Sequence, residues 1–208
     1  MWSSELQQTI IQRCAAAEYR LQEPLSRHTS FRIGGPAAVM AFPKNSEELK
    51  SLLQGAAAAG IKPYILGAGT NILAPDEGLD ALVICLKDAL CGIRLLDETR
   101  IEAYAGESMA KAAVFAKNHA LTGLEFAHGI PGTLGGGVYM NAGAYGGELR
   151  QVVESVTVLT MDGEERTLSG PECAFGYRTS VYQTLPCVIV KAVLCLQPGD
   201  PEKIGQTM

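Results

Sequence analysis

The stretch from Gly129 to Gly147 has the composition of a ligand-binding backbone segment. It holds eight of the 23 glycines in nineteen residues, and Pro131, Thr133 and Asn141 interrupt it at irregular intervals. Glycine at this density costs backbone entropy, and is tolerated where the main chain takes positive φ or closely approaches another group. The N–H groups of such loops bind anions. We therefore predict a phosphate or pyrophosphate cradle, with a purely structural glycine corner as the alternative.

A second candidate anion loop is Gly67-Ala-Gly-Thr-Asn71, which follows the expected strand Tyr64–Leu66. Its start resembles the dinucleotide fingerprint G-x-G-x-x-G, but Ile72 occupies the third glycine position. Pro75 and Asp76 then prevent the long helix that such a site requires. A Rossmann site is therefore disfavoured, and the chain holds no P-loop string. A strand-to-loop anion cradle remains, and a tight turn between strands is its alternative.

Residues 175–180, Phe-Gly-Tyr-Arg-Thr-Ser, supply a third chemical feature. Tyr177 offers a phenolic O–H beside the fixed positive fork of Arg178, and this pair suits an anionic carboxylate. A surface strand with Arg178 in a salt bridge is the alternative. The two glycine loops lie in successive predicted lobes, so we expect a pyrophosphate held between the lobes by backbone amides.

The elements that position these segments alternate between helix and strand. In the first lobe, hydrophobic periodicity predicts a helix that begins at the N-cap Ser46 and ends at Gly60. In the second lobe, Asp162-Gly163 predicts the turn of a hairpin. We expect helices over 5–19, 46–60 and 108–118, a helix beginning at Asp200, strands over 37–42, 64–66, 81–86, 101–104 and 187–196, and a hairpin over 152–168.

Composition excludes several classes of protein. The net charge of −5 comes without a basic run, which argues against nucleic-acid binding. The six cysteines include no C-x-x-C pair and the three histidines lack zinc spacing, so we expect buried free thiols and no metal site. The N-terminus has no apolar signal region and no apolar run is long enough to span a bilayer. We therefore expect a cytoplasmic protein without membrane contact.

Taken together, five segments resemble the bacterial UDP-N-acetylenolpyruvoylglucosamine reductases, flavoenzymes of peptidoglycan precursor synthesis. The resemblance runs from about residue 25 to residue 196 in the same order. The segments are His28-Thr-Ser-Phe-Arg-Ile-Gly-Gly35, Leu66-Gly-Ala-Gly-Thr-Asn-Ile-Leu73, Gly123-Leu-Glu-Phe126, residues 129–136 with 140–147, and residues 175–180.

This resemblance implies an α+β, two-lobed FAD-binding domain of the vanillyl-alcohol oxidase and p-cresol methylhydroxylase type. The implied organisation is an N-terminal helix and lead-in over 1–26 and an FAD-binding domain over 27–197. Its lobes are about 27–98 and about 99–197. Residues 198–208 then begin a missing C-terminal substrate-binding domain.

The resemblance also implies a reaction and a set of site residues. FAD, reduced by NADPH, would reduce UDP-N-acetylglucosamine enolpyruvate to UDP-N-acetylmuramate. Arg178 matches the active-site arginine that stabilises charge on the substrate carboxylate, and Tyr177 matches a tyrosine of the substrate site. The positions that match or neighbour FAD contacts are Leu66, Gly67, Ala68, Gly69, Thr70, Asn71, Ile130, Pro131, Gly132, Thr133, Gly135, Gly136, Asn141, Gly143 and Ala144.

Two expected segments are absent from this sequence. The family's serine proton donor lies in a downstream Gly-Ser-x-Phe-Lys-Asn-Pro-like segment, and its glutamate lies nearer the C-terminus; neither is found. Ser180 belongs to the Tyr-Arg-x-Ser motif and does not replace the donor. We therefore expect a C-terminally truncated reductase, monomeric when full length. The alternatives are a flavin-binding fragment without turnover and a nucleotide-binding module of a different flavoprotein.

Overall fold

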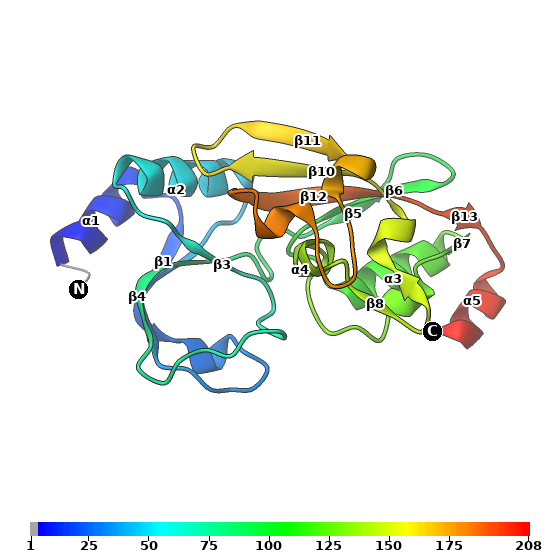
Figure 1. The fold of residues 1–208 in the computed structure, drawn as a ribbon, viewed down its shortest axis with the longest axis horizontal. Helices are drawn as coiled ribbons and strands as arrows, with labels where there is room; N and C mark the ends of the chain where they lie inside the picture. Colours follow the sequence, from blue (N-terminus) through cyan, green and yellow to red (C-terminus); the bar gives the residue numbers. More distant parts are fainter. Residues whose placement is uncertain (1–3) are drawn as a thin grey trace. The chain divides into compact units, whose positions relative to one another are not determined.

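The structure is a computed structural model that describes residues 4–208, with side chains described from residue 7 onward. Its contacts divide the chain into two compact units (Figure 1). Unit 1 comprises the residues up to Leu90 together with Leu159–Glu164, and unit 2 comprises Cys91–Val158 and Glu165–Met208. Each unit has its own sheet and is described by itself.

Unit 1 is a small mixed sheet with two helices. The sheet has the order β1-β2-β4-β3, in which β1 pairs antiparallel with β2, and β2 and β3 each pair parallel with β4. In Figure 1, α1 and α2 lie side by side, as their contacts require. The elements are α1 (Ser4–Arg13), β1 (Glu18–Pro24), the 3-10 helix η1 (Leu25–Arg27), β2 (Pro36–Phe42), α2 (Ser46–Ala58), β3 (Tyr64–Leu66) and β4 (Leu79–Cys85).

The prediction of one opening helix over 5–19 is wrong beyond residue 13. The helix ends at Arg13, and β1 begins at Glu18, where it pairs with Phe42 at the far end of β2. The phenolic O–H of Tyr19 donates to the carbonyl of Cys14 at 2.7 Å and fixes the intervening turn. Pairing with β2 thus overrides the helical periodicity of the sequence, since local propensity is weak beside tertiary contacts.

Helix α2 confirms the predicted helix, but its cap lies one residue earlier than expected. The side chain of Asn45, not Ser46, accepts a hydrogen bond from the N–H of Glu48 at 2.9 Å. The Glu48 carboxylate in turn accepts from the N–H of Lys44 at 2.8 Å, so two N–H groups at the helix start are satisfied. Gly60, with φ +69°, follows the helix in the left-handed conformation that ends it.

Unit 2 is built on a sheet of order β11-β10-β12-β6-β5. The predicted hairpin is confirmed as β10 and β11, with Gly163 at φ +86° in the connection. The terminal helix predicted from Asp200 is present as α5 within unit 2. The elements are β5 (Ile93–Leu95), β6 (Arg100–Tyr104), α3 (Met109–Asn118), β7 (Leu121–Thr122), η2 (Glu125–Ala127), α4 (Leu134–Met140), β8 (Gly143–Ala144), β9 (Gly147–Glu148), η3 (Leu149–Gln151), β10 (Val153–Thr160), β11 (Glu165–Ser169), η4 (Pro171–Cys173), η5 (Val181–Gln183), β12 (Cys187–Cys195), β13 (Gln197–Pro198) and α5 (Pro201–Thr207).

The core of unit 2 places α4 against the sheet. Leu134 and Val138 are fully buried and contribute to one cluster with Ile101 of β6 and Leu194 of β12. Helix α4 contacts the neighbouring strands β12 and β6 of this sheet, and also α3 and η5. Burying a leucine or valine side chain contributes about 1.5–3 kcal/mol, so tertiary packing rather than helix propensity stabilises this short helix.

A buried acid supports the sheet of unit 2. Glu102 of β6 lies directly opposite Arg94 of β5, and its carboxylate contacts Arg94 Nε at 2.7 Å and Lys191 Nζ at 2.9 Å. Burial alone would raise the pKa of Glu102, but the hydrogen bonds and charges of Arg94 and Lys191 outweigh it and hold that pKa below its usual range. The charged carboxylate is therefore the form that stabilises the fold.

We expect Glu102→Gln to lower the free energy of unfolding by about 1–2 kcal/mol at pH 7, because a charge-assisted bridge is lost. A carboxyl whose folded pKa is depressed stabilises above its unfolded pKa, and the effect is lost as pH falls through the folded pKa. The difference from wild type should thus shrink below about pH 4. Denaturant titrations at pH 7 and pH 3 measure this. Glu154→Gln, which removes an exposed partner of Arg100 at 3.2 Å, is the control and should change little.

Candidate functional site

The loop 67–71 of unit 1 is held by close backbone packing. Gly69 has φ +63°, and a Cβ at this position would lie 2.0 Å from the carbonyl oxygen of His28. The N–H of Ser30 also donates to the Gly69 carbonyl at 3.0 Å. Only glycine allows both this conformation and this approach. The loop is therefore built on the segment that follows β1 and η1.

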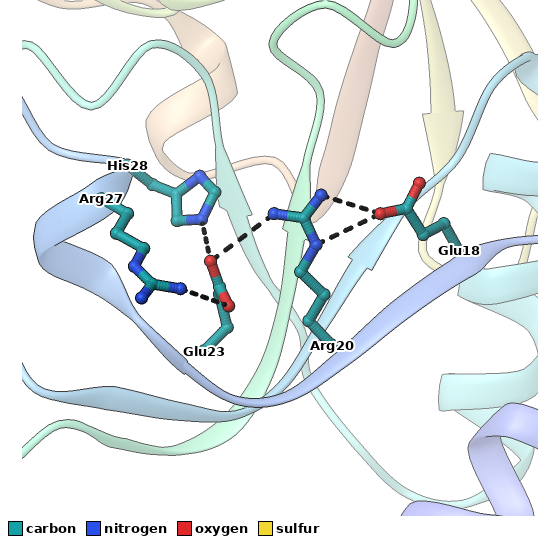
Figure 2. Close-up of polar contacts among 5 residues, drawn as sticks. All are labelled: Glu18, Arg20, Glu23, Arg27 and His28. Atoms are coloured by element: carbon teal, nitrogen blue, oxygen red, sulfur yellow. Dashed lines mark hydrogen bonds and ion pairs between the residues drawn. The ribbon is translucent and has the colours of Figure 1, made fainter.

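That supporting segment is fixed by the buried carboxylate of Glu23 (Figure 2). Its oxygens contact His28 Nε2 at 2.9 Å, Arg20 Nη1 at 3.6 Å and Arg27 Nη1 at 3.7 Å. Burial raises the pKa of Glu23, but the hydrogen bond and charge of His28 and the two guanidinium groups outweigh it, so this pKa is lowered overall. The negative charge thus orders the chain on both sides of η1.

The other predicted residues of this loop run from the buried end of β3 to the surface. Leu66 is buried and its carbonyl accepts from the N–H of Leu86 at 2.8 Å, which ties the end of β3 into the sheet. Gly67, Ala68 and Thr70 are half-buried, and Asn71 is exposed. The loop can therefore present main-chain and side-chain groups to a ligand while Gly69 holds its shape.

In unit 2 the glycine-rich stretch is not a continuous loop. Residues Leu134–Met140 form α4, and the Thr133 hydroxyl caps it by accepting from the N–H of Gly136 at 3.4 Å. We correct the prediction of a loop over 129–147 accordingly. The helix forms because the burial of Leu134 and Val138 outweighs the poor helix propensity of three consecutive glycines.

Half of the glycines in this stretch are required by protein packing. At four of the eight glycines, an added Cβ would lie under 3 Å from a neighbouring atom. These positions are Gly135, against Ala105 Cβ at 2.8 Å; Gly137, against Met109 Sδ at 2.8 Å; Gly143, against the Gly147 carbonyl at 2.6 Å; and Gly147, against Phe126 Cδ1 at 2.5 Å. The structural alternative therefore explains much of the glycine density.

Several N–H groups predicted to bind phosphate already have acceptors inside the protein. The pairs are Ile130 N–H to the Ala127 carbonyl at 3.2 Å, Leu134 N–H to the Glu107 carbonyl at 2.7 Å, and Gly135 N–H to the Ala105 carbonyl at 2.9 Å. Gly136 N–H bonds the capping hydroxyl described above. A contact between residues 130–136 and a ligand would therefore use their other exposed groups.

The remaining predicted residues of unit 2 share one pocket of about 240 Å³. It brings the end of the glycine-rich stretch together with the Tyr177-Arg178 pair, although Gly143 and Arg178 lie 35 positions apart in the sequence. The lining residues are Asn141, Gly143, Ala144, Tyr145, Gly146, Gly147, Glu148, Tyr177 and Arg178. Five of them are among the predicted site residues, whereas Tyr145 and Glu148 are not.

Tyr145 is the clearest residue that sequence reasoning missed. Its side chain is 96% exposed, that of Tyr177 is 90% exposed, and Tyr145 has φ +53°. A non-glycine residue held at positive φ with an exposed aromatic ring is unusual, and such strain concentrates at functional sites. The available signal was an aromatic side chain inside a glycine run. Two exposed rings beside Arg178 suit a planar, anionic ligand.

Arg178 lies at the tip of a tight turn. Gly176 and Thr179 bond each other in both directions across the turn, at 3.0 and 3.4 Å. Arg178 itself has φ +54°, a conformation that costs an ordinary L-residue about 1–2 kcal/mol. Its Nη2 donates to the Gly143 carbonyl at 3.0 Å, and its guanidinium carbon lies 5.9 Å from the centre of the Tyr177 ring.

The alternative prediction for Arg178, a surface strand with a salt bridge, does not describe this turn. Within residues 7–208 no carboxylate pairs with the Arg178 guanidinium, whose side-chain partner is the neutral Gly143 carbonyl. Glu148 lies in the same pocket but pairs with Arg150. The positive charge of Arg178 is therefore available to an anionic group.

Asn141, predicted to contact a cofactor, lines the pocket, but its side chain is engaged by the protein. It is 2% exposed and ends α4 with φ +44°. Its Nδ2 donates to Glu148 Oε2 at 2.7 Å and to the Gly176 carbonyl at 2.8 Å. Its Oδ1 accepts from the N–H of Arg150 at 2.9 Å. These bonds use both N–H groups and the oxygen of the amide.

A further hollow of about 460 Å³ lies against α3, lined among others by Ile93, Glu107 and Phe115, and it holds none of the predicted site residues. Within residues 4–208 no three His, Cys, Asp or Glu side chains gather as a metal site, and no helix could cross a membrane. Cys14, Cys85 and Cys173 are buried as thiols. The expectation of buried thiols is wrong for Cys91 and Cys195, which are exposed, and Cys187 is only half-buried.

The two sheets with their glycine-rich connections define an FAD-binding fold. Solved structures with it include 4-ethylphenol oxidase from Gulosibacter chungangensis (TM-score 0.69, 13% identity, 94% of this chain and 43% of that one). Glucooligosaccharide oxidase from Acremonium strictum is similar (TM-score 0.66, 16% identity, 90% of this chain and 42% of that one). Residues 36–169 match the FAD binding domain family, and the chain belongs to this family. The predicted fold class and the predicted FAD cofactor are thereby confirmed.

The more similar relatives confirm the family resemblance drawn from the five segments. UDP-N-acetylenolpyruvoylglucosamine reductase from Streptococcus thermophilus is 43% identical over 92% of this chain and 62% of its own length. The Lactobacillus helveticus relative of that name is 44% identical over 88% of the chain and 61% of its length. The solved reductase from Thermus caldophilus has a TM-score of 0.71 at 31% identity and covers 92% of this chain and 66% of that one. The chain thus spans less than two thirds of the length of these relatives.

We expect Gly69→Ala to weaken FAD binding at least about tenfold, because a Cβ cannot coexist with the His28 carbonyl and the loop must move. Gly60→Ala is the matched control: Gly60 has φ +69°, but a Cβ added there would meet nothing within 4 Å, so it carries the conformational strain without the clash. Quenching of flavin fluorescence measures both affinities. Equal FAD affinities in the two variants would contradict the role of the loop.

Proposed function

We propose that this chain provides the FAD-binding part of a UDP-N-acetylenolpyruvoylglucosamine reductase, which uses NADPH to reduce UDP-N-acetylglucosamine enolpyruvate to UDP-N-acetylmuramate. The single observation that carries the proposal is the pocket in which Arg178 and Tyr177 meet the end of the glycine-rich stretch. Similarity to reductases along about nine tenths of the chain supports it. NADPH and nucleotide sugars are intracellular metabolites, so we also propose a cytoplasmic location. For the full-length protein we propose a monomer.

The residues fit a flavin in two respects. Gly69 leaves no room for a Cβ at the centre of the 67–71 loop, and the pocket of unit 2 offers exposed aromatic rings beside a cation. FAD, when bound, supplies the hydride that it obtains from NADPH. We propose as its contacts the loop Leu66–Asn71, the exposed groups of residues 130–136, and Gly143 with Ala144. Asn141 would act from beneath them.

Arg178 would bind the carboxylate of the enolpyruvyl group. A guanidinium presents paired donors in a plane that matches a carboxylate, and charge-assisted hydrogen bonds of this kind are about twice as strong as neutral ones. As negative charge develops beside the carboxylate during reduction, a fixed cation stabilises it without reorganisation. Tyr177, next to Arg178 and exposed, would line the substrate with its ring and phenolic O–H.

A second candidate is a flavin-binding domain without turnover. The chain spans 62% of the length of the Streptococcus thermophilus relative. Ser180 does not offer a substitute proton donor, because its side chain is buried and its Oγ donates to the Tyr139 carbonyl at 2.7 Å. Under this candidate, Arg178 and the glycine loops retain their binding roles.

NADPH oxidation that depends on the enolpyruvyl UDP-sugar, measured with the FAD-loaded chain, separates the two candidates. Substrate-dependent oxidation supports the reductase, whereas a yellow, FAD-bound chain that does not oxidise NADPH supports the second candidate. A chain that stays colourless after reconstitution with FAD contradicts both.

In an active form, we expect Arg178→Ala and Arg178→Gly to lower kcat about 100-fold or more with little change in FAD affinity. Glycine relieves the positive φ that alanine keeps, so equal losses in the two variants would assign the effect to the missing charge. A loss confined to Arg178→Ala would instead assign it to distortion of the turn, and would contradict the proposed role.

A further inference from the structure

The turn that carries Arg178 is attached to the glycine-rich stretch at both of its ends. On the leading side, Asn141 Nδ2 donates to the Gly176 carbonyl at 2.8 Å; on the trailing side, Ser180 Oγ donates to the Tyr139 carbonyl at 2.7 Å. Asn141 and Ser180 are 2% and 5% exposed. Buried hydrogen bonds without competing water are the contacts most able to hold an exposed turn in one place.

Asparagine is the side chain that position 141 demands. The backbone there has φ +44°, which asparagine tolerates better than most residues. The surroundings require two donors, toward Glu148 and Gly176, and one acceptor, toward the N–H of Arg150. Aspartate would place an oxygen against the Gly176 carbonyl and a second charge beside Glu148. Glycine would satisfy the backbone but make none of the three bonds.

We propose that Asn141 is a positioning residue: it holds the Gly176–Thr179 turn against the glycine-rich stretch, so that the Arg178 guanidinium is presented at a fixed place over Gly143–Gly147. The strained conformation of Arg178 makes such an anchor necessary, because an exposed turn with an arginine at φ +54° would otherwise relax. The consequence for the ligand rests on the proposed function, whereas the anchoring itself does not.

The hydrogen bond from Asn141 to Glu148 offers a way to test the anchoring of the turn separately from the contribution of Asn141 to the stability of the fold. In the double variant Asn141→Asp with Glu148→Gln, the amide of residue 148 can donate to the carboxylate of residue 141, which restores that bond with reversed polarity. The aspartate can still accept from the N–H of Arg150. The hydrogen bond to the Gly176 carbonyl is lost, and so is the negative charge that Glu148 presents to Arg150, although the amide oxygen at position 148 can still accept from the Arg150 side chain. The double variant therefore removes the anchor and keeps the other hydrogen bonds of the network.

Nuclear magnetic resonance of the chain without ligand tests the anchor directly. In wild type, we expect a scalar coupling across the hydrogen bond from the Asn141 side-chain N–H to the Gly176 carbonyl. In the double variant, we expect the order parameters of the Tyr177 and Arg178 amides to fall from about 0.85 to below about 0.6. Its melting temperature should stay within about 4 °C of wild type.

Two results would overturn the proposal. One is the absence of the coupling in wild type, which does not depend on any variant folding. The other is a double variant in which the turn keeps its wild-type order parameters, since Asn141 would then serve only the end of α4. Ser180→Ala is the matched control for the trailing side, and should loosen the turn while leaving the Asn141 coupling in place.

A kinetic cycle tests the functional consequence in an active, FAD-loaded form. The Asn141→Asp, Glu148→Gln pair should lower kcat about tenfold or more with FAD affinity nearly unchanged. In the Arg178→Ala background the same pair should have no further effect, because the residue that it positions is gone. Additive losses would contradict positioning through Arg178. Failure of the reductase proposal would appear as an inactive wild type and leave the resonance result intact.

Discussion

One buried amide, that of Asn141, sets the geometry of the candidate site in unit 2. Its left-handed backbone ends α4 after seven residues, and the chain can then reverse through β8 and β9. Its side chain joins the end of α4 to two further segments, one at residues 148 and 150 and one at Gly176, which lies 35 positions away in the sequence. A buried amide that makes all of these bonds is stabilising, whereas the loss of any partner leaves a costly unsatisfied group. The pocket exists because these requirements are met together.

Glycine serves two physical purposes in this chain, and the sequence does not distinguish them. At Gly69 it permits a backbone conformation and a contact of the loop with the His28 carbonyl. At Gly135 and Gly137 it lets α4 approach Ala105 and Met109, which is a matter of packing. The glycine-rich stretch therefore owes its composition partly to the core of unit 2. The surface that remains for a ligand lies at its end, around Tyr145 and Gly146.

The sequence predicted the elements whose signals are local. Helix α2 has a capping residue and an acidic first turn, and the β10–β11 hairpin has Asp162-Gly163 at its centre, so both were found. Strand β1 and helix α4 were missed because tertiary pairing and burial, not local propensity, decide them. The pocket was half predicted: residue types identified Tyr177 and Arg178, but no spacing rule places them beside Gly143. The positive φ of Tyr145 and Arg178 is equally invisible in a sequence.

The central proposal, which starts from the FAD-binding family, is that FAD contacts residues 66–71 in unit 1 and Gly143 with Ala144 in unit 2, and that Arg178 is left for the substrate. A titration of the isotope-labelled chain with FAD, followed by amide chemical shifts, tests this most directly. We expect the large, saturable shifts at residues 66–71 and at Gly143 and Ala144. Saturable binding whose shifts fall elsewhere and leave these residues unchanged would contradict the claim.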